Sequence, residues 1–232
     1  MKKFTPTLLT AILGLSGAAQ AAPLYNDDFS SLANWTLLGD VTAYSGYGVV
    51  TTAHTSEGDY ANLSGNNPVE THVGPAGLEA FVGLAQGALD LSNASQATEG
   101  SAIKRSFNVK AGDKLGVDWL LVTNDTGAGF GLDYGFAVID GQLISLASAS
   151  SAGTQFSPPY AWATAPGRFD YTFQRSGNIS VAFGVVDVGD YSASTAFGID
   201  SLSITAAVPE PGSYALLLVG LGLVGALARR RG

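Results

Sequence analysis

The feature that most constrains the fold of this chain is an alternation of apolar and polar residues that recurs through its middle. Two segments show it best, KLGVDWLLVT at 114–123 and NISVAFGVVD at 178–187. In each, every second residue is apolar, which is typical of a strand with one buried face. The predicted buried faces hold Leu115, Val117, Trp119 and Leu121 in the first segment, and Ile179, Val181, Phe183 and Val185 in the second.

Turn signals separate these strands from others. Asp140-Gly141 lies between YGFAVI and QLISLA, which predicts a two-residue hairpin. Ser176-Gly177-Asn178 follows RFDYTFQR. Further strand candidates are NWTLL, GYGVVTT, DYANLS, AIKRSFNV and FGIDSLSIT, whereas residues 77–100 are less regular and fit a strand followed by a short helix or a loop. About ten short strands in one domain predict an all-β, antiparallel, jelly-roll-like β-sandwich.

The N-terminal segment differs from this middle. Lys2 and Lys3 precede an apolar stretch at residues 8–19 and the small-residue sequence Ala19-Gln20-Ala21. A basic start, a short apolar core and an Ala-x-Ala site predict a signal peptide over residues 1–21. The mature sandwich domain would then span residues 22–207.

A second apolar run lies near the C-terminus, between Pro209-Glu210-Pro211 and Arg229-Arg230-Arg231. Its uncharged residues 213–228 predict a single transmembrane helix of marginal length. The arginines favour a cytoplasmic C-terminus.

Charge and cysteine content exclude several classes of function. The net charge is −8, and residues 22–208 hold six basic and eighteen acidic residues, a net charge of −12. Such a surface repels nucleic acid, and it attracts cations. The chain has no cysteine, so disulfides, thiol catalysis and cysteine-ligated zinc are excluded.

The C-terminal residues 208–232 resemble the PEP-CTERM sorting signal of Gram-negative bacteria. The resemblance rests on Val208, Pro209, Glu210 and Pro211, the apolar run, and Arg229, Arg230 and Arg231. It implies processing by exosortase, a precursor held in the inner membrane by a transient helix, and delivery to the cell surface or the extracellular matrix. It also implies a link to exopolysaccharide and biofilm. The middle resembles the jelly-roll ectodomains often attached to this signal.

Calcium is one ligand that the acidic turns could hold. By resemblance to such jelly rolls, a structural calcium would join the first strand to the last, which here means Asp27 or Asp28 with Asp200. Asp200 shares strand parity with Leu202 and Ile204, so we expect it to point inward. The alternative is that these carboxylates cap backbone N–H groups in turns.

Sugar is a second candidate ligand, because exposed aromatic rings stack on the apolar faces of pyranose rings. The segment SPPYAWATAPGRF places Tyr160, Trp162 and Phe169 near three prolines, and Tyr44, Tyr47 and Tyr191 are further candidates. The alternative for Tyr160 and Trp162 is packing that anchors their loop.

Support for catalysis is thin. His54 and His72 are the only histidines and are expected in polar loops or at the surface, and the sequence contains no G-x-S-x-G or H-E-x-x-H. We therefore expect a non-catalytic structural or interaction protein. A carbohydrate-binding module and a polysaccharide-acting enzyme are the alternatives.

Overall fold

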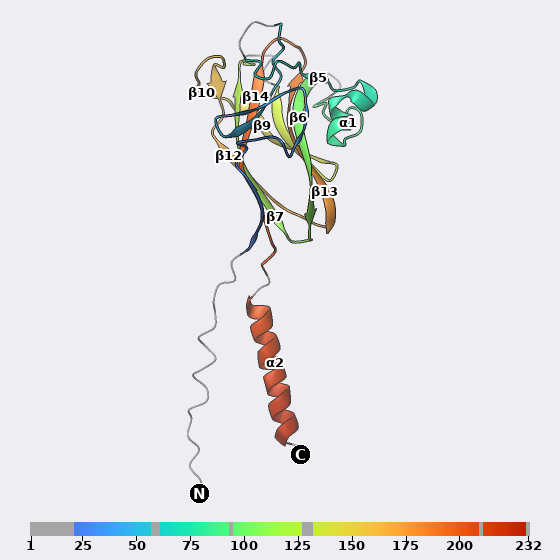
Figure 1. The fold of residues 1–232 in the computed structure, drawn as a ribbon, viewed down its shortest axis with the longest axis vertical. Helices are drawn as coiled ribbons and strands as arrows, with labels where there is room; N and C mark the ends of the chain where they lie inside the picture. Colours follow the sequence, from blue (N-terminus) through green and yellow to red (C-terminus); the bar gives the residue numbers. More distant parts are fainter. Residues whose placement is uncertain (1–20, 57–60, 93–94, 127–131, 209–210, 231–232) are drawn as a thin grey trace.

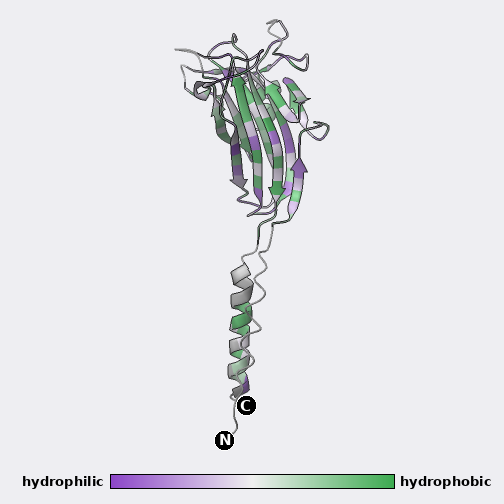
Figure 2. Ribbon diagram, turned by 90° about the vertical axis from the view of Figure 1, so that its left-hand side faces the viewer, coloured by the Kyte–Doolittle hydropathy of each residue, from purple (hydrophilic) through white to green (hydrophobic). Residues whose placement is uncertain are grey.

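The computed structural model describes residues 21–56, 61–92, 95–126, 132–208 and 211–230. The predicted signal peptide falls almost wholly outside these residues. Two antiparallel sheets face each other (Figure 1), so the predicted all-β, two-sheet sandwich is confirmed. The strands carry bands of hydrophobic residues along their length (Figure 2), as the alternation in the sequence predicts.

The larger sheet has eight strands. Its order is β10 (Thr154–Gln155), β11 (Trp162–Ala163), β7 (Lys114–Thr123), β14 (Thr195–Thr205), β4 (Tyr47–Thr51) and β3 (Asp40–Tyr44). In addition β1 (Pro23–Asp27) pairs with β14, and β12 (Gly167–Thr172) pairs with β7.

The smaller sheet has six strands. Its order is β2 (Thr36–Leu38), β6 (Ala97–Val109), β13 (Gly177–Val188), β8 (Tyr134–Ile139) and β9 (Gln142–Ser148), and β5 (Val69–Glu70) also pairs with β6. Asp140 and Gly141 join β8 to β9 with φ angles of 55° and 76°, as the predicted two-residue hairpin requires.

Residues outside the strands include short helices. The segment 77–100 forms α1 (Leu78–Val82) and then runs into β6, so the helix comes first and the strand second, the reverse of the predicted order. The single-turn helices η1 (Gly74–Ala76) and η2 (Ala149–Ser151) lie in loops. Within the predicted strand DYANLS, the described residues 61–64 form a loop.

The main core fills the space between the sheets. The residues of β7 and β13 predicted to be buried are buried there, except Trp119, which is half-buried at its edge. Phe183 and Phe197 are fully buried, and each such side chain contributes about 1.5–3 kcal/mol to folding. A second cluster lies between α1 and the outer face of the smaller sheet, with Leu78 and Phe136 at its centre.

Helix α2 (Pro211–Arg230) is drawn apart from the sandwich, below the end where β1 begins and β14 ends (Figure 1). Its bounds include the apolar run at 213–228, so the prediction that this run is helical is confirmed. The run was also expected to be a transmembrane helix. Among the described residues, however, no helix combines the length and the apolar character that crossing a membrane requires.

Candidate functional site

A row of exposed side chains crosses the outer face of the larger sheet. Tyr44 of β3 pairs with Tyr47 of β4, Asp200 of β14 pairs with Asp118 of β7, and Asp118 pairs with Arg168 of β12. Gly48 of β4 pairs with Ile199 of β14, so the next residues along these antiparallel strands, Tyr47 and Asp200, also face each other. We call the five residues Tyr44, Tyr47, Asp200, Asp118 and Arg168 the cross-sheet row.

The backbone alternation fixes the face to which the row belongs. Ile199 and Val117 point into the core, so their chain neighbours Asp200 and Asp118 point outward. The ring of Tyr47 lies over Gly198, because a Cβ added to Gly198 would be 3.4 Å from Tyr47 Cδ1. Glycine therefore leaves room for an aromatic ring on this face.

The tyrosine end of the row is open to solvent. Tyr44 is 61% exposed and Tyr47 is 38% exposed. Aromatic rings of this size are costly to leave in water, and a pair of them on one face offers a flat apolar surface.

The other end of the row is charged. Arg168 donates hydrogen bonds from Nη1 to Asp118 at 2.9 Å and from Nε to Asp170 at 3.2 Å. The hydrogen bond to Asp118, together with the charge of Asp170, raises the pKa of the Arg168 guanidinium. Asp200 accepts a hydrogen bond from the backbone N–H of its neighbour Ser201. The face therefore combines exposed aromatic rings with hydrogen-bond donors and acceptors.

The outward direction of Asp200 corrects the expectation that it points into the core. A β-bulge interrupts the pairing of β14 with β7 between Asp200 and Ser203, and Ser201 has a φ of 52°. The extra residue reverses the alternation, so Leu202 is buried and Asp200 is not.

The residues proposed for calcium are not brought together. Asp27 lies opposite Leu202 and accepts hydrogen bonds from the backbone N–H of Phe29 and from Trp35 Nε1, both at 2.9 Å. Asp28 accepts hydrogen bonds from the N–H and hydroxyl of Ser30. Both carboxylates therefore act as caps of a turn, as the alternative interpretation predicts. Within the described ranges, no three carboxylate or imidazole groups are placed to hold a metal ion.

The two aromatic residues first proposed for sugar binding differ in their exposure. Tyr160 is only 5% exposed and packs with Val122 and Ala196 on the outer face of the larger sheet, so at this position the structure supports the alternative, packing that anchors the loop. Asn124 holds the loop in place through hydrogen bonds to Pro159 O and from the Ala161 N–H. Trp162 is half-buried in β11, and the loop carries no pair of open rings.

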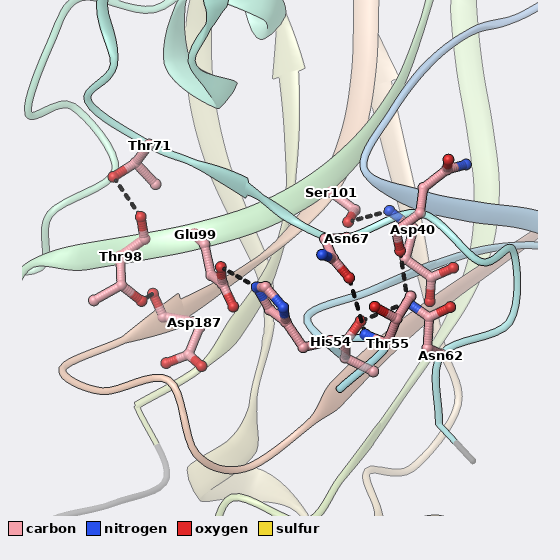
Figure 3. Close-up of polar contacts among 12 residues, drawn as sticks. Asp40, His54, Thr55, Asn62, Asn67, Thr71, Thr98, Glu99, Ser101 and Asp187 are labelled. Atoms are coloured by element: carbon pink, nitrogen blue, oxygen red, sulfur yellow. Dashed lines mark hydrogen bonds and ion pairs between the residues drawn. The ribbon is translucent and has the colours of Figure 1, made fainter. Parts of the chain in front are cut away.

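Polar side chains fill the end of the sandwich that lies away from β1 and α2. The buried carboxylate of Asp40 accepts hydrogen bonds from the N–H groups of Leu63 and Ser64 and from the Thr51 hydroxyl. The Asp40 N–H donates to Ser101 Oγ at 2.9 Å, which links the two sheets (Figure 3). Because these groups satisfy one another, this network holds loops in place.

Each histidine pairs with a buried glutamate. His54 Nε2 lies 3.1 Å from Glu99 Oε2 (Figure 3), and His72 Nδ1 lies 3.0 Å from Glu79 Oε2. Glu79 also accepts hydrogen bonds from the N–H groups of nearby loop residues, among them that of Leu89 at 2.9 Å. These histidines therefore fasten loops to β6 and α1.

Two further carboxylates are buried at the same end. Asp133 accepts hydrogen bonds from the Val188 N–H at 3.0 Å and the Thr195 hydroxyl at 2.6 Å. Burial raises the pKa of Asp133, and burial together with the charge of Asp133 raises the pKa of Asp187. Asp187 is 3% exposed and lies in a bulge of β13, beside Glu99 (Figure 3).

Sequence reasoning missed the row, although it had named Tyr44 and Tyr47. The available signal was parity: Asp118 alternates with Val117 and Trp119, so an outward position could be predicted. The order of the strands β3, β4, β14, β7 and β12 brings together residues that lie as far apart in the sequence as Tyr44 and Asp200. A local sequence pattern does not predict this strand order.

Several solved structures share the general architecture. A mannan-recognising carbohydrate-binding module, TmCBM27, is 17% identical, with 81% of this chain and 99% of that chain covered and a TM-score of 0.43. The CBM22-1 xylan-binding domain of Paenibacillus barcinonensis Xyn10C is 11% identical over 83% and 99%, with a TM-score of 0.34. The K3 adhesin domain of Lys-gingipain from Porphyromonas gingivalis is 12% identical over 80% and 99%, with a TM-score of 0.39. Similarity at this level transfers neither a ligand nor a binding site.

The C-terminal segment gives a more specific result. No curated protein matches the chain in sequence. Residues 207–231 match the model of the PEP-CTERM protein-sorting motif. Such a motif implies processing by exosortase and export to the cell surface. This chain therefore carries a C-terminal PEP-CTERM protein-sorting motif behind a β-sandwich domain.

Proposed function

We propose that this protein is a non-catalytic component of the cell surface or extracellular matrix, and that its sandwich domain binds exopolysaccharide through the cross-sheet row. In this proposal residues 1–21 are a signal peptide, residues 22–207 are the binding domain, and residues 208–232 are the segment that exosortase recognises. No step of the proposed role needs an active site.

The observation that supports polysaccharide binding is the composition of the row. Tyr44 and Tyr47 offer exposed rings that can stack on the apolar faces of sugar residues. Asp118, Arg168 and Asp200 follow in the same line and offer acceptors and donors for sugar hydroxyls. Five strands at about 4.8 Å spacing carry the row, so it extends over roughly 19 Å, the length of several sugar residues. A polymer chain lying across the strands would meet every member of the row.

The charge of the domain restricts the polymer. With a net charge of −12 over residues 22–208, the domain repels polyanions. We therefore expect a neutral or amine-bearing polysaccharide rather than a polyuronate.

The test is affinity electrophoresis of the full-length protein in gels that contain a neutral glucan, mannan, xylan or galactan, or the polyuronate alginate. We expect at least one neutral polymer to retard the protein, and the double variant Tyr44→Ala/Tyr47→Ala to run about as fast as in a gel without polymer. Tyr191→Ala is the matched control, since Tyr191 is 50% exposed and lies outside the row. Equal retardation of the double variant and the control would contradict the proposed site.

A further inference from the structure

A cavity opens between the two sheets on the side opposite β3. Its volume is about 410 Å³, and its walls come from β7, β9, η2 and the segment between β11 and β12. This volume lies within the usual range of small-molecule pockets, which is about 300–1,000 Å³. The cross-sheet row lies on the outer face of the larger sheet, so the cavity is a separate feature.

Irregular pairing borders the cavity in both sheets. In β9, Gly135 pairs with Ala147 but Phe136 pairs with Ser145, so Leu146 is the extra residue of a β-bulge. Bulges of this kind are frequent next to binding sites, where they redirect a side chain.

Across the opening, the edge of the larger sheet is also interrupted. Strand β11 ends at Ala163 and β12 begins at Gly167, although both pair with β7. Between them the Thr164 N–H donates to Leu121 O at 2.9 Å, and Ala165 is exposed at the rim.

Trp119 forms the aromatic wall of the cavity. A Cβ added to Gly167 would lie 2.1 Å from Trp119 Cζ2, so the indole ring lies directly over this glycine. The ring of Phe197, with its centroid 6.1 Å away, supports Trp119 from the core. The indole is therefore held in a fixed position while the side chain stays half-buried at the cavity.

The remaining lining is apolar or hydroxyl-bearing. Ser151 and Thr164 contribute hydroxyl groups, and Leu146 contributes apolar surface. Ser145 and Ser148 border the cavity through the backbone of β9, because they pair with Phe136 and Tyr134, whose side chains lie on the outer face of the smaller sheet. None of the described lining residues is charged, in a domain that carries a net charge of −12. An uncharged site with one aromatic wall and two hydroxyl groups suits a neutral ligand that has both an apolar face and hydroxyl groups.

We propose that this cavity is a second binding site, which takes a neutral sugar residue or disaccharide. The sugar would stack its apolar face on Trp119 and exchange hydrogen bonds with the hydroxyl groups of Ser151 and Thr164. The proposal does not depend on polysaccharide binding by the cross-sheet row. The cavity would bind a short sugar or the end of a chain, whereas the cross-sheet row would bind a polymer along its length.

The experiment is a titration of the full-length protein with glucose, mannose, galactose and their β-1,4-linked disaccharides, followed by tryptophan fluorescence. Of the three tryptophans, Trp119 lines the cavity, Trp35 is buried in the core, and Trp162 of β11 is not among the lining residues. We expect a saturable change for at least one neutral sugar and none for galacturonic acid. No saturable change with any neutral sugar up to roughly 100 mM would overturn the proposal.

Two variants locate the signal. Ala165→Phe would fill the rim and weaken the affinity by about tenfold or more, whereas Ala33→Phe, at another exposed alanine, would leave it within about twofold. Equal affinities for these two variants would overturn the proposal. If Tyr44→Ala/Tyr47→Ala abolishes the sugar titration and Ala165→Phe does not, the sugar binds at the row. In that case the cavity proposal fails while the proposed function stands.

Discussion

Asp118 and Asp200 lie directly opposite each other in neighbouring strands β7 and β14, on the outer face of the larger sheet. Arg168 is paired with Asp118 but has no such contact with Asp200 among the described ion pairs. Like charges in opposed positions of an antiparallel pair destabilise a sheet. The domain therefore keeps an unfavourable pair of like charges beside the exposed ring of Tyr47, as expected if these carboxylates serve the proposed binding.

Removing one charge of this pair should stabilise the domain. We expect Asp200→Asn to raise the free energy of unfolding by about 0.2–1 kcal/mol, because the repulsion from Asp118 disappears. Asp118→Asn should stabilise less or destabilise, since it also removes the negative charge that strengthens the hydrogen bond from Arg168. Urea unfolding of both variants at low salt measures the difference, and equal effects would contradict this account of the pair.

The packing between the sheets depends on the close approach of the Phe197 ring to the backbone of Gly135. A Cβ there would lie 2.3 Å from the ring of Phe197, so Gly135→Ala must displace a fully buried phenylalanine. We expect a loss of about 1–3 kcal/mol in the free energy of unfolding. Gly153→Ala is the control, because a Cβ at Gly153 meets no atom within 4 Å. A loss no larger for Gly135→Ala than for the control would show that Phe197 can move freely.

The buried carboxylates make stability depend on pH. In the folded protein the pKa of Asp187 is raised, above all by burial and then by the charge of Asp133. The folded state therefore holds a proton that the unfolded state releases near pH 4, so this group lowers stability as pH rises above about 4.

The variant Asp187→Asn should remove this loss, because its amide stays neutral. We expect the urea midpoint of Asp187→Asn, measured relative to that of the wild type, to increase from pH 4 to pH 8. Asp170→Asn serves as control, since the Asp170 side chain is 71% exposed. A constant difference between Asp187→Asn and the wild type over this pH range would contradict the raised pKa.

The sorting motif predicts a change in covalent structure. If exosortase recognises the motif, Glu210→Ala should leave the C-terminal segment on the mature protein, whereas Ser213→Ala should be processed normally. Intact-mass measurement of the cell-bound and released protein separates the two forms. An intact tail in the mature wild-type protein would contradict processing.

Local sequence patterns predicted most of the fold. Alternation placed β7 and β13 and their buried faces, and Asp140-Gly141 predicted the β8–β9 hairpin. The direction of Asp200 was missed because one residue of a bulge, Ser201, reverses the alternation and leaves no mark in composition. For Tyr160 the sequence left binding and loop-anchoring packing open, because a tyrosine in a proline-rich segment has the same sequence whether its loop packs on the sheet or stands away from it.

The candidate site was less predictable than the fold. Tyr44 and Tyr47 could be named individually, but their alignment with Asp118, Arg168 and Asp200 depends on the order of five strands. That order is set by long-range pairing, which the spacing of residues along the chain does not encode.

The central claim is that a polymer chain binds along the cross-sheet row. The most direct measurement is a ¹H–¹⁵N spectrum of the labelled protein, recorded with and without oligosaccharides prepared from a polysaccharide that retards it. The account predicts that the largest shifts fall on the amides of Tyr44, Tyr47, Asp118, Arg168 and Asp200 and on Gly198 between them. Shifts that concentrate instead on the outer face of the smaller sheet, around α1 and β6, would contradict it.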